Sequence, residues 1–157
     1  MAEGSLITDE LRKLIGVPSE TIVFKVEEGA IQRYAQAIGD PNPLYNEPDS
    51  ASKTKHGRLL APPGFTGWPV KAGRPAEKMF ELLVKAGAPP RVLDGGVEFE
   101  FIEPIGAGDT LAATPRIAGI TERETRLGKA MFTTIETAFV NREGNVAVRS
   151  RSTLIQF

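Results

Sequence analysis

The chain closes with the stretch that decides its fold: Lys129-Ala-Met-Phe-Thr-Thr-Ile-Glu-Thr-Ala-Phe-Val-Asn141, then Arg142-Glu-Gly-Asn145, then Val146-Ala-Val-Arg-Ser-Arg-Ser-Thr-Leu-Ile-Gln-Phe157. Both long runs are rich in β-branched and aromatic residues, whose side chains alternate between two faces of an extended strand. The short Gly-containing segment between them is typical of a hairpin turn. These residues predict an antiparallel hairpin with one face against a core and the other in water.

The preceding sequence extends this hairpin into a larger sheet. Two further β-rich runs lie at residues 97–102 and 110–120, and a partly alternating strand is predicted at 21–26. Apolar residues at three- and four-residue spacing predict amphipathic helices at 28–38, which Gly39 is placed to end, and at 76–86. This order predicts an α+β fold in which an antiparallel sheet wraps a helix, as a single domain over residues 1–157.

Charge and composition exclude several classes of function. The 157 residues carry 19 Lys and Arg against 20 Asp and Glu, so no basic face is available for nucleic acid or an anionic membrane. Residues 1–8 contain neither a basic segment nor a long apolar run, so we expect a soluble cytoplasmic protein with no membrane partner. With no Cys and one His, the chain is not expected to hold a transition metal.

The segment that follows the first helix, GDPNPLYNEP at residues 39–48, is predicted to be a rigid loop because its three prolines remove backbone donors. Residues 49–55 are expected to form one or two helical turns capped by Asp49 or Ser50. Asp40 has two readings at this point. It is either a residue that forms the turn or a general acid/base.

Three motifs in this order resemble one family: Gly39-Asp-Pro-Asn-Pro-Leu-Tyr45, Leu59-Leu-Ala-Pro-Pro-Gly-Phe65, and Phe99-Glu-Phe-Ile-Glu-Pro-Ile-Gly-Ala-Gly-Asp-Thr110. Together with the closing hairpin they are similar to the MaoC-like dehydratases and (R)-specific enoyl-CoA hydratases. The branch most similar is that of the MaoC-like N-terminal, or fungal-fatty-acid-synthase-type, dehydratase domains. The resemblance runs from residue 17 to residue 157 and implies a hot-dog fold, whose sheet curls around a central helix.

The resemblance implies a hydro-lyase that adds or removes water at the 2,3 position of an acyl thioester carried on CoA or acyl carrier protein. By that resemblance Asp40 matches the catalytic Asp and Asn42 the family's Asn, and Gly64 matches the glycine whose N–H holds the thioester oxygen at the start of the central helix. Tyr45 stands where the family has a catalytic His. A tyrosine hydroxyl donates a hydrogen bond but is a poor base at neutral pH, so we favour a packing role for Tyr45.

Other candidates for substrate binding lie around these motifs. His56 is the only imidazole, and Arg58 beside it is a candidate for the CoA phosphates, although a solvated basic loop is the simpler reading of both. Phe65 and Trp68 are candidates to line an acyl tunnel, although large apolar groups near a helix usually belong to a core.

Three functions remain open. The first is an active hydratase or dehydratase that needs no cofactor, in which Tyr45, His56 or a bound water works with catalytic Asp40 in place of the missing His. The second is an acyl-binding companion subunit that lost the His. The third, a hot-dog thioesterase, ranks last because such enzymes lack the Asp40 loop. A hot-dog sheet leaves an edge strand open, so we expect a homodimer or a hetero-oligomer with another hot-dog subunit.

Overall fold

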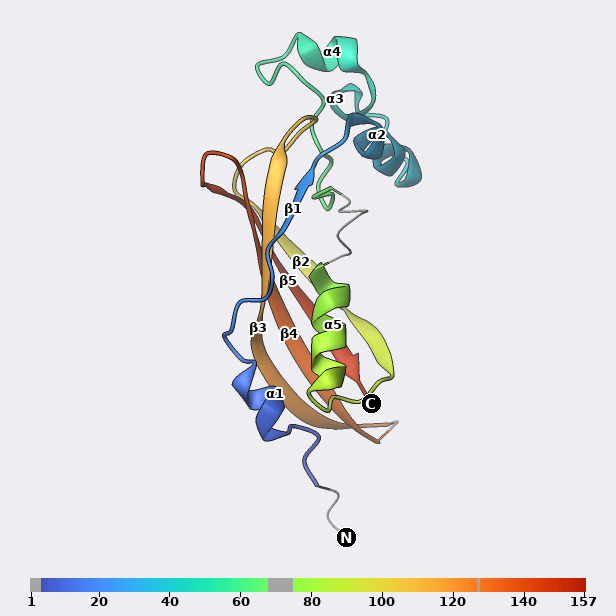
Figure 1. The fold of residues 1–157 in the computed structure, drawn as a ribbon. Helices are drawn as coiled ribbons and strands as arrows, with labels where there is room; N and C mark the ends of the chain where they lie inside the picture. Colours follow the sequence, from blue (N-terminus) through green and yellow to red (C-terminus); the bar gives the residue numbers. More distant parts are fainter. Residues whose placement is uncertain (1–3, 68–74, 127) are drawn as a thin grey trace.

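Five strands form one antiparallel sheet in the computed structural model, which describes residues 4–67, 75–126 and 128–157. They are β1 (Ile22–Lys25), β2 (Val92–Phe101), β3 (Thr110–Thr125), β4 (Gly128–Val140) and β5 (Val146–Gln156). Their order across the sheet is β1-β3-β4-β5-β2, and each neighbouring pair is antiparallel (Figure 1). The predicted α+β class is confirmed.

The helices lie at two places relative to this sheet. They are α1 (Asp9–Lys13), α2 (Glu28–Ala37), α3 (Pro43–Asn46), α4 (Pro48–Ser52) and α5 (Pro75–Lys85). Figure 1 shows α2, α3 and α4 gathered at one end of the sheet, whereas α5 lies along its face. No helix among the described residues has the length and apolarity that a membrane crossing requires.

The predicted closing hairpin is confirmed as β4 and β5. Side chains along β4 alternate as expected: Thr133, Ile135 and Thr137 are buried, whereas Thr134 and Glu136 lie on the other face. This alternation lets one face of the sheet pack on the protein core while the other meets solvent.

Two strands are longer than their sequence pattern predicted. β2 begins at Val92 rather than residue 97, because its pairing with β5 continues across a register shift between Asp94 and Val97. Gly96 has φ +110° there and donates its N–H to Asp94 Oδ1 at 2.8 Å, so the Gly pair makes a bulge instead of ending the strand. β3 continues past residue 120 to Thr125 because it stays paired with β4.

The segment at residues 39–48 contains more helix than predicted. The prolines Pro43 and Pro48 occupy the first turns of α3 and α4, where a missing N–H costs no hydrogen bond. The caps also differ from the prediction, since α4 starts after Glu47 and neither Asp49 nor Ser50 caps it. α1 was not predicted. Thr8 caps it by accepting a hydrogen bond from the Leu11 N–H at 3.1 Å.

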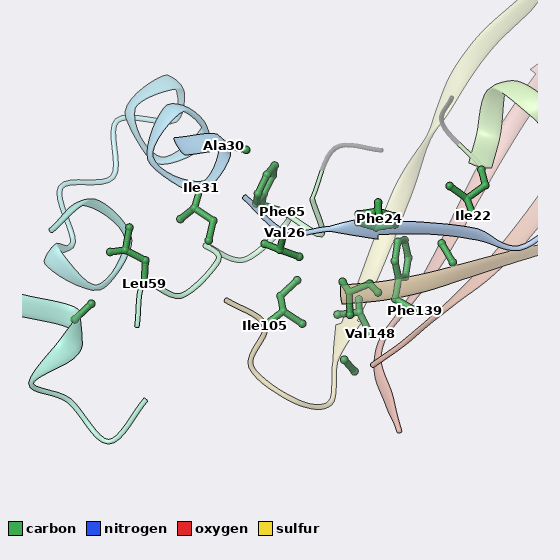
Figure 2. Close-up of a cluster of buried hydrophobic side chains, with 14 residues drawn as sticks. Ile22, Phe24, Val26, Ala30, Ile31, Leu59, Phe65, Ile105, Phe139 and Val148 are labelled. Atoms are coloured by element: carbon green, nitrogen blue, oxygen red, sulfur yellow. The ribbon is translucent and has the colours of Figure 1, made fainter. Parts of the chain in front are cut away.

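The core consists of two apolar clusters. One lies between β1, α2 and the sheet end nearest them, and Figure 2 shows its buried side chains, which include Phe24, Ile31 and Phe65. The other joins Leu83 of α5 to Ile135 of β4. The first cluster therefore supports the end of the molecule that carries the Asp40 loop.

Candidate functional site

The Asp40 loop is held by its own short polar side chains. α2 ends at Ala37, and Gly39 with φ +70° turns the chain away from the helix axis. Asp40 Oδ1 then accepts the Asn42 N–H at 2.9 Å, and Asn42 Oδ1 accepts the Leu44 N–H at 3.0 Å. These contacts are turn-forming side-chain bonds of the kind that Asp and Asn favour.

Asn46 also holds the Asp40 loop in place, a role that the sequence analysis did not predict. Its Nδ2 donates to the carbonyl oxygens of Asp40 and Asn42, both at 2.9 Å. Gln32 Nε2 on α2 in turn donates to the Asn46 carbonyl oxygen at 3.1 Å. The loop is thus a closed hydrogen-bonded unit anchored to α2. The only sequence signal for it is the spacing of the polar amides.

Asp40 has features that suit both readings from the sequence. Its side chain is half-buried, and one carboxylate oxygen supports the turn. Within the described residues no donor is assigned to the other oxygen, Oδ2. One oxygen therefore orients the carboxylate while the other can accept a proton or bind water.

Gly64 lies in a turn instead of at the start of a helix. The Phe65 N–H donates to the Pro62 carbonyl at 3.0 Å, and Gly64 has φ +90°. Residues 65–67 are not helical, and α5 begins at Pro75. The expectation that a helix begins near Gly64 is therefore wrong for the described part of this segment.

The structure brings the Asp40 loop and the Gly64 turn to the same end of the molecule. The Leu60 N–H donates to the Leu44 carbonyl at 2.9 Å, which joins the segment before Gly64 to α3. On the α2 side, the Tyr34 hydroxyl lies 2.8 Å from the position that a Cβ on Gly64 would take. We call this end of the molecule, residues 28–67, the site region.

Two aromatic candidates serve as packing groups in this region. Phe65 is buried in the first core cluster with 2% of its surface exposed, and its ring centroid lies 4.9 Å from that of Tyr34. Tyr45 is half-buried and packs against the same cluster. Trp68 lies outside the described residues.

The two basic candidates differ in their surroundings. Arg58 forms a two-pronged ion pair with Asp109, in which Nη2 lies 2.9 Å from Oδ2. Gly106 donates its N–H to the same Asp109 oxygen at 2.9 Å, so this pair ties the segment after α4 to the chain before β3. His56 is half-buried in the neighbouring turn.

Hollows of similar volume lie at two places on the described surface, and the residues lining them do not include Asp40 or Gly64. One of about 600 Å³ lies beside Arg58, Glu27 and Gly108. The other, of about 590 Å³, lies over the sheet and includes Glu136 and residues of β2 and β5.

The Arg151 and Arg116 side chains bond to Glu136 and hold the pKa of its carboxyl below the usual range. Such a pair stabilises the charged form of a surface carboxylate.

A family model described as "FAS1-like, dehydratase domain region" matches residues 13–150. A UPF0336 protein of Streptomyces avermitilis is 32% identical over 108 residues, which are 62% of this chain and 63% of that protein. A UPF0336 protein of Parafrankia is 31% identical over 84% of this chain and 87% of its own length. A probable enoyl-CoA hydratase alpha subunit of Thermomonospora curvata is 26% identical over 81% of this chain and 43% of that protein.

Solved structures show the same fold. A MaoC-like dehydratase from Rhodospirillum rubrum is 26% identical with a TM-score of 0.62, over 94% of this chain and 95% of that one. A chain of the HadBC (3R-hydroxyacyl-ACP dehydratase) complex from Mycobacterium tuberculosis has a TM-score of 0.69 at 22% identity, over 95% and 98% of the two chains. At that identity the second likeness concerns the fold alone.

Proposed function

This chain belongs to the family of FAS1-like dehydratase domain regions, and from that premise we propose that it hydrates or dehydrates acyl thioesters. In the hydration direction, the oxygen of water bonds to C3 of the enoyl group and a proton is added at C2. The observation that supports this proposal best is the joining of the Asp40 loop and the Gly64 segment through the hydrogen bond from Leu60 to Leu44. The proposal requires one thioester bound at this end of the molecule to contact both segments.

Each candidate has a separate role in the proposed reaction. Asp40 binds the water through Oδ2 and, in the hydration direction, takes a proton from it. Asn42 keeps the carboxylate oriented by donating its N–H to Oδ1. Gly64 offers its N–H to the thioester oxygen, where negative charge develops. His56, Arg58, Phe65 and Trp68 remain candidates for binding the CoA or acyl part of the substrate. The reaction draws on no cofactor.

The alternative is an acyl-binding companion subunit, and Tyr45 is the observation that favours it. By the sequence resemblance Tyr45 matches the position of the family's catalytic His, and in the structure it packs against the first core cluster. The HadBC complex contains two kinds of subunit, and the Thermomonospora relative is named an alpha subunit. Under this alternative a second hot-dog chain supplies the missing imidazole.

We also propose where a partner subunit binds. β2 is an edge strand of the sheet, and nine of its ten residues are exposed. Its apolar side chains are open to solvent, with Leu93 51%, Val97 50% and Phe101 37% exposed. An edge with these features favours pairing with another chain, which supports a homodimer or a hetero-oligomer. A cytoplasmic location is part of the same proposal.

The direct test is the loss of enoyl-thioester absorbance with crotonyl-CoA and with a longer enoyl-CoA. Turnover by the purified chain alone supports the hydratase. If the purified chain shows no turnover by itself but does so after a His-bearing hot-dog partner is added, the result supports the companion subunit. Release of free thiol without hydration supports a thioesterase.

The Asp40→Asn variant is the matched control for this assay, because its amide oxygen can still accept the Asn42 N–H while the acid/base group is lost. We expect its kcat to fall at least about 10²-fold, in the usual range for losing a general acid/base, with unchanged folding. Wild-type turnover in this variant would exclude the proposed role of Asp40.

A further inference from the structure

The hydroxyl of Tyr34 occupies an unusual position beside Gly64. α2 holds Tyr34 half-buried, with its ring against Phe65 at a centroid distance of 4.9 Å. The hydroxyl oxygen lies 2.8 Å from where a Gly64 side chain would begin, while the ring carbon Cζ is 3.9 Å from the same point. Only a residue without a side chain allows the hydroxyl to approach the turn so closely.

The Tyr34 hydroxyl and the Gly64 N–H are the two polar groups of interest at this position. Within the described residues, no hydrogen bond is assigned to the Tyr34 hydroxyl or to the Gly64 N–H. The Tyr34 hydroxyl is not among the buried polar atoms that lack a partner in the described residues, so it remains accessible to water or to a ligand. Packing on Phe65 accounts for the ring of Tyr34 and leaves its hydroxyl unexplained.

We propose that the Tyr34 hydroxyl and the Gly64 N–H together bind the carbonyl oxygen of the thioester. This inference rests on the proposed function and adds a second donor to it. Both groups donate, and a carbonyl oxygen has two lone pairs to accept from them. Gly64 is not at a helix start in the described chain, so its N–H has no adjoining helix dipole to strengthen it.

The Tyr34 hydroxyl, as the second donor, would act during the addition of water to the enoyl thioester. As the water oxygen bonds to C3, the electron pair of the double bond moves toward the carbonyl, whose oxygen becomes negative until a proton reaches C2. A fixed phenol O–H and a fixed amide N–H stabilise this enolate more than the neutral thioester, because their hydrogen bonds strengthen with the charge. The proton that water releases passes to Asp40 and from there to C2, and neither donor loses its own proton, so the step balances with water and thioester as the only reactants.

The first test is Tyr34→Phe in the full chain, assayed with a His-bearing partner if the chain needs one. The ring and its packing remain, so folding should be unchanged, while kcat should fall roughly 10²-fold, as for other single oxyanion donors. Thr21→Val is the control, because it removes an exposed hydroxyl that bonds only to Thr114, and its kcat should equal that of the wild type.

The second test needs no turnover and compares butyryl-CoA with its thioether analogue, which lacks the carbonyl oxygen. The wild type should bind the thioester more tightly, and Tyr34→Phe should reduce that preference by about 3- to 10-fold, the value of one neutral hydrogen bond. A merely structural role of Tyr34 would change both affinities equally.

The outcomes separate this inference from the proposed function. Equal kcat and equal thioester preference in the wild type and Tyr34→Phe would overturn the inference while leaving the hydratase intact. If the wild type neither hydrates enoyl-CoA with any partner nor binds butyryl-CoA, the proposed function and the inference both fail.

Discussion

The site region and the sheet are built by different interactions. In the site region, side chains such as Asp40, Asn42 and Asn46 bond to nearby backbone, and Asp40 Oδ2 has no hydrogen-bond donor among the described residues. In the sheet, the strand ladders satisfy the backbone, and residues such as Ile135 fill the core. Because Ile31 and Phe65 of the site region also pack in a core cluster, we expect both regions to contribute stability but only the site region to take part in the proposed chemistry. Substitutions in the two regions should therefore have separable effects.

The largest effect on stability is expected from Ile135→Ala in the sheet. Ile135 is 1% exposed and packs in the cluster that joins α5 to the sheet. The cavity should lower the free energy of unfolding by about 2–5 kcal/mol, while the kcat of the remaining folded enzyme stays near that of the wild type. Urea unfolding and the enoyl-CoA assay measure the two quantities.

Thr134→Ala is the matched control, because Thr134 lies next in the strand on the opposite face. It should change stability by less than about 0.5 kcal/mol. If Ile135→Ala abolished kcat in folded protein, the two regions would not be separable.

A smaller effect is expected from Gly64→Ala, which tests the geometry of the turn. The new methyl meets both a φ of +90° and the Tyr34 hydroxyl at 2.8 Å, so we expect a loss of about 1–3 kcal/mol, within the range for a strained backbone residue. Adding Tyr34→Phe should restore part of the lost free energy of unfolding, because the nearest remaining ring atom, Cζ, lies 3.9 Å from the new Cβ. Urea midpoints of the single and double variants measure this coupling.

Gly39→Ala separates backbone strain from the clash. Gly39 has φ +70°, but its added Cβ would meet nothing within 4 Å. It should show no coupling to Tyr34→Phe. Equal coupling at Gly39 and Gly64 would mean that the Tyr34 hydroxyl does not touch the turn.

The smallest effect is expected from Glu136→Gln on the outer face of the sheet. Hydrogen bonds from Arg151 and then Arg116 lower the pKa of Glu136 in the folded state below its ordinary 4.5. Its stabilisation is therefore fully present above that value and is lost as the pH falls below 4.5 toward the lowered folded value. The variant should be less stable at neutral pH by under about 1 kcal/mol.

Urea unfolding across the acid range measures this difference, which should shrink as the wild-type carboxyl is protonated. A difference that grows in acid would show that the two arginines do not stabilise the carboxylate.

The alternation of apolar and polar residues predicted the sheet, because burial of every second side chain can be seen within the sequence of each strand. It missed the start of β2 because Gly95 and Gly96, usually breakers, form a bulge that only the pairing with β5 keeps within the strand. It missed α3 because a cap at Asn42 and a proline in the first turn suit a loop equally well.

The candidate site was only partly accessible to sequence reasoning. The resemblance identified Asp40 and Gly64, and the structure places their segments at one end of the molecule. Tyr34 lies within the helix predicted at residues 28–38, and nothing in the sequence singled it out. The role proposed for its hydroxyl depends on the close approach of that hydroxyl to Gly64, thirty residues away in the chain, which no local sequence pattern reveals.

The proposed reaction requires one thioester to contact both the Asp40 loop and the Gly64 turn. The most direct measurement is a titration of ¹⁵N-labelled protein with butyryl-CoA, followed through its backbone amide signals. We expect the Gly64 and Asn42 signals to shift together with a single dissociation constant, while Arg151 in the hollow over the sheet does not respond. Shifts confined to that hollow, with Gly64 and Asn42 unmoved at saturation, would contradict it.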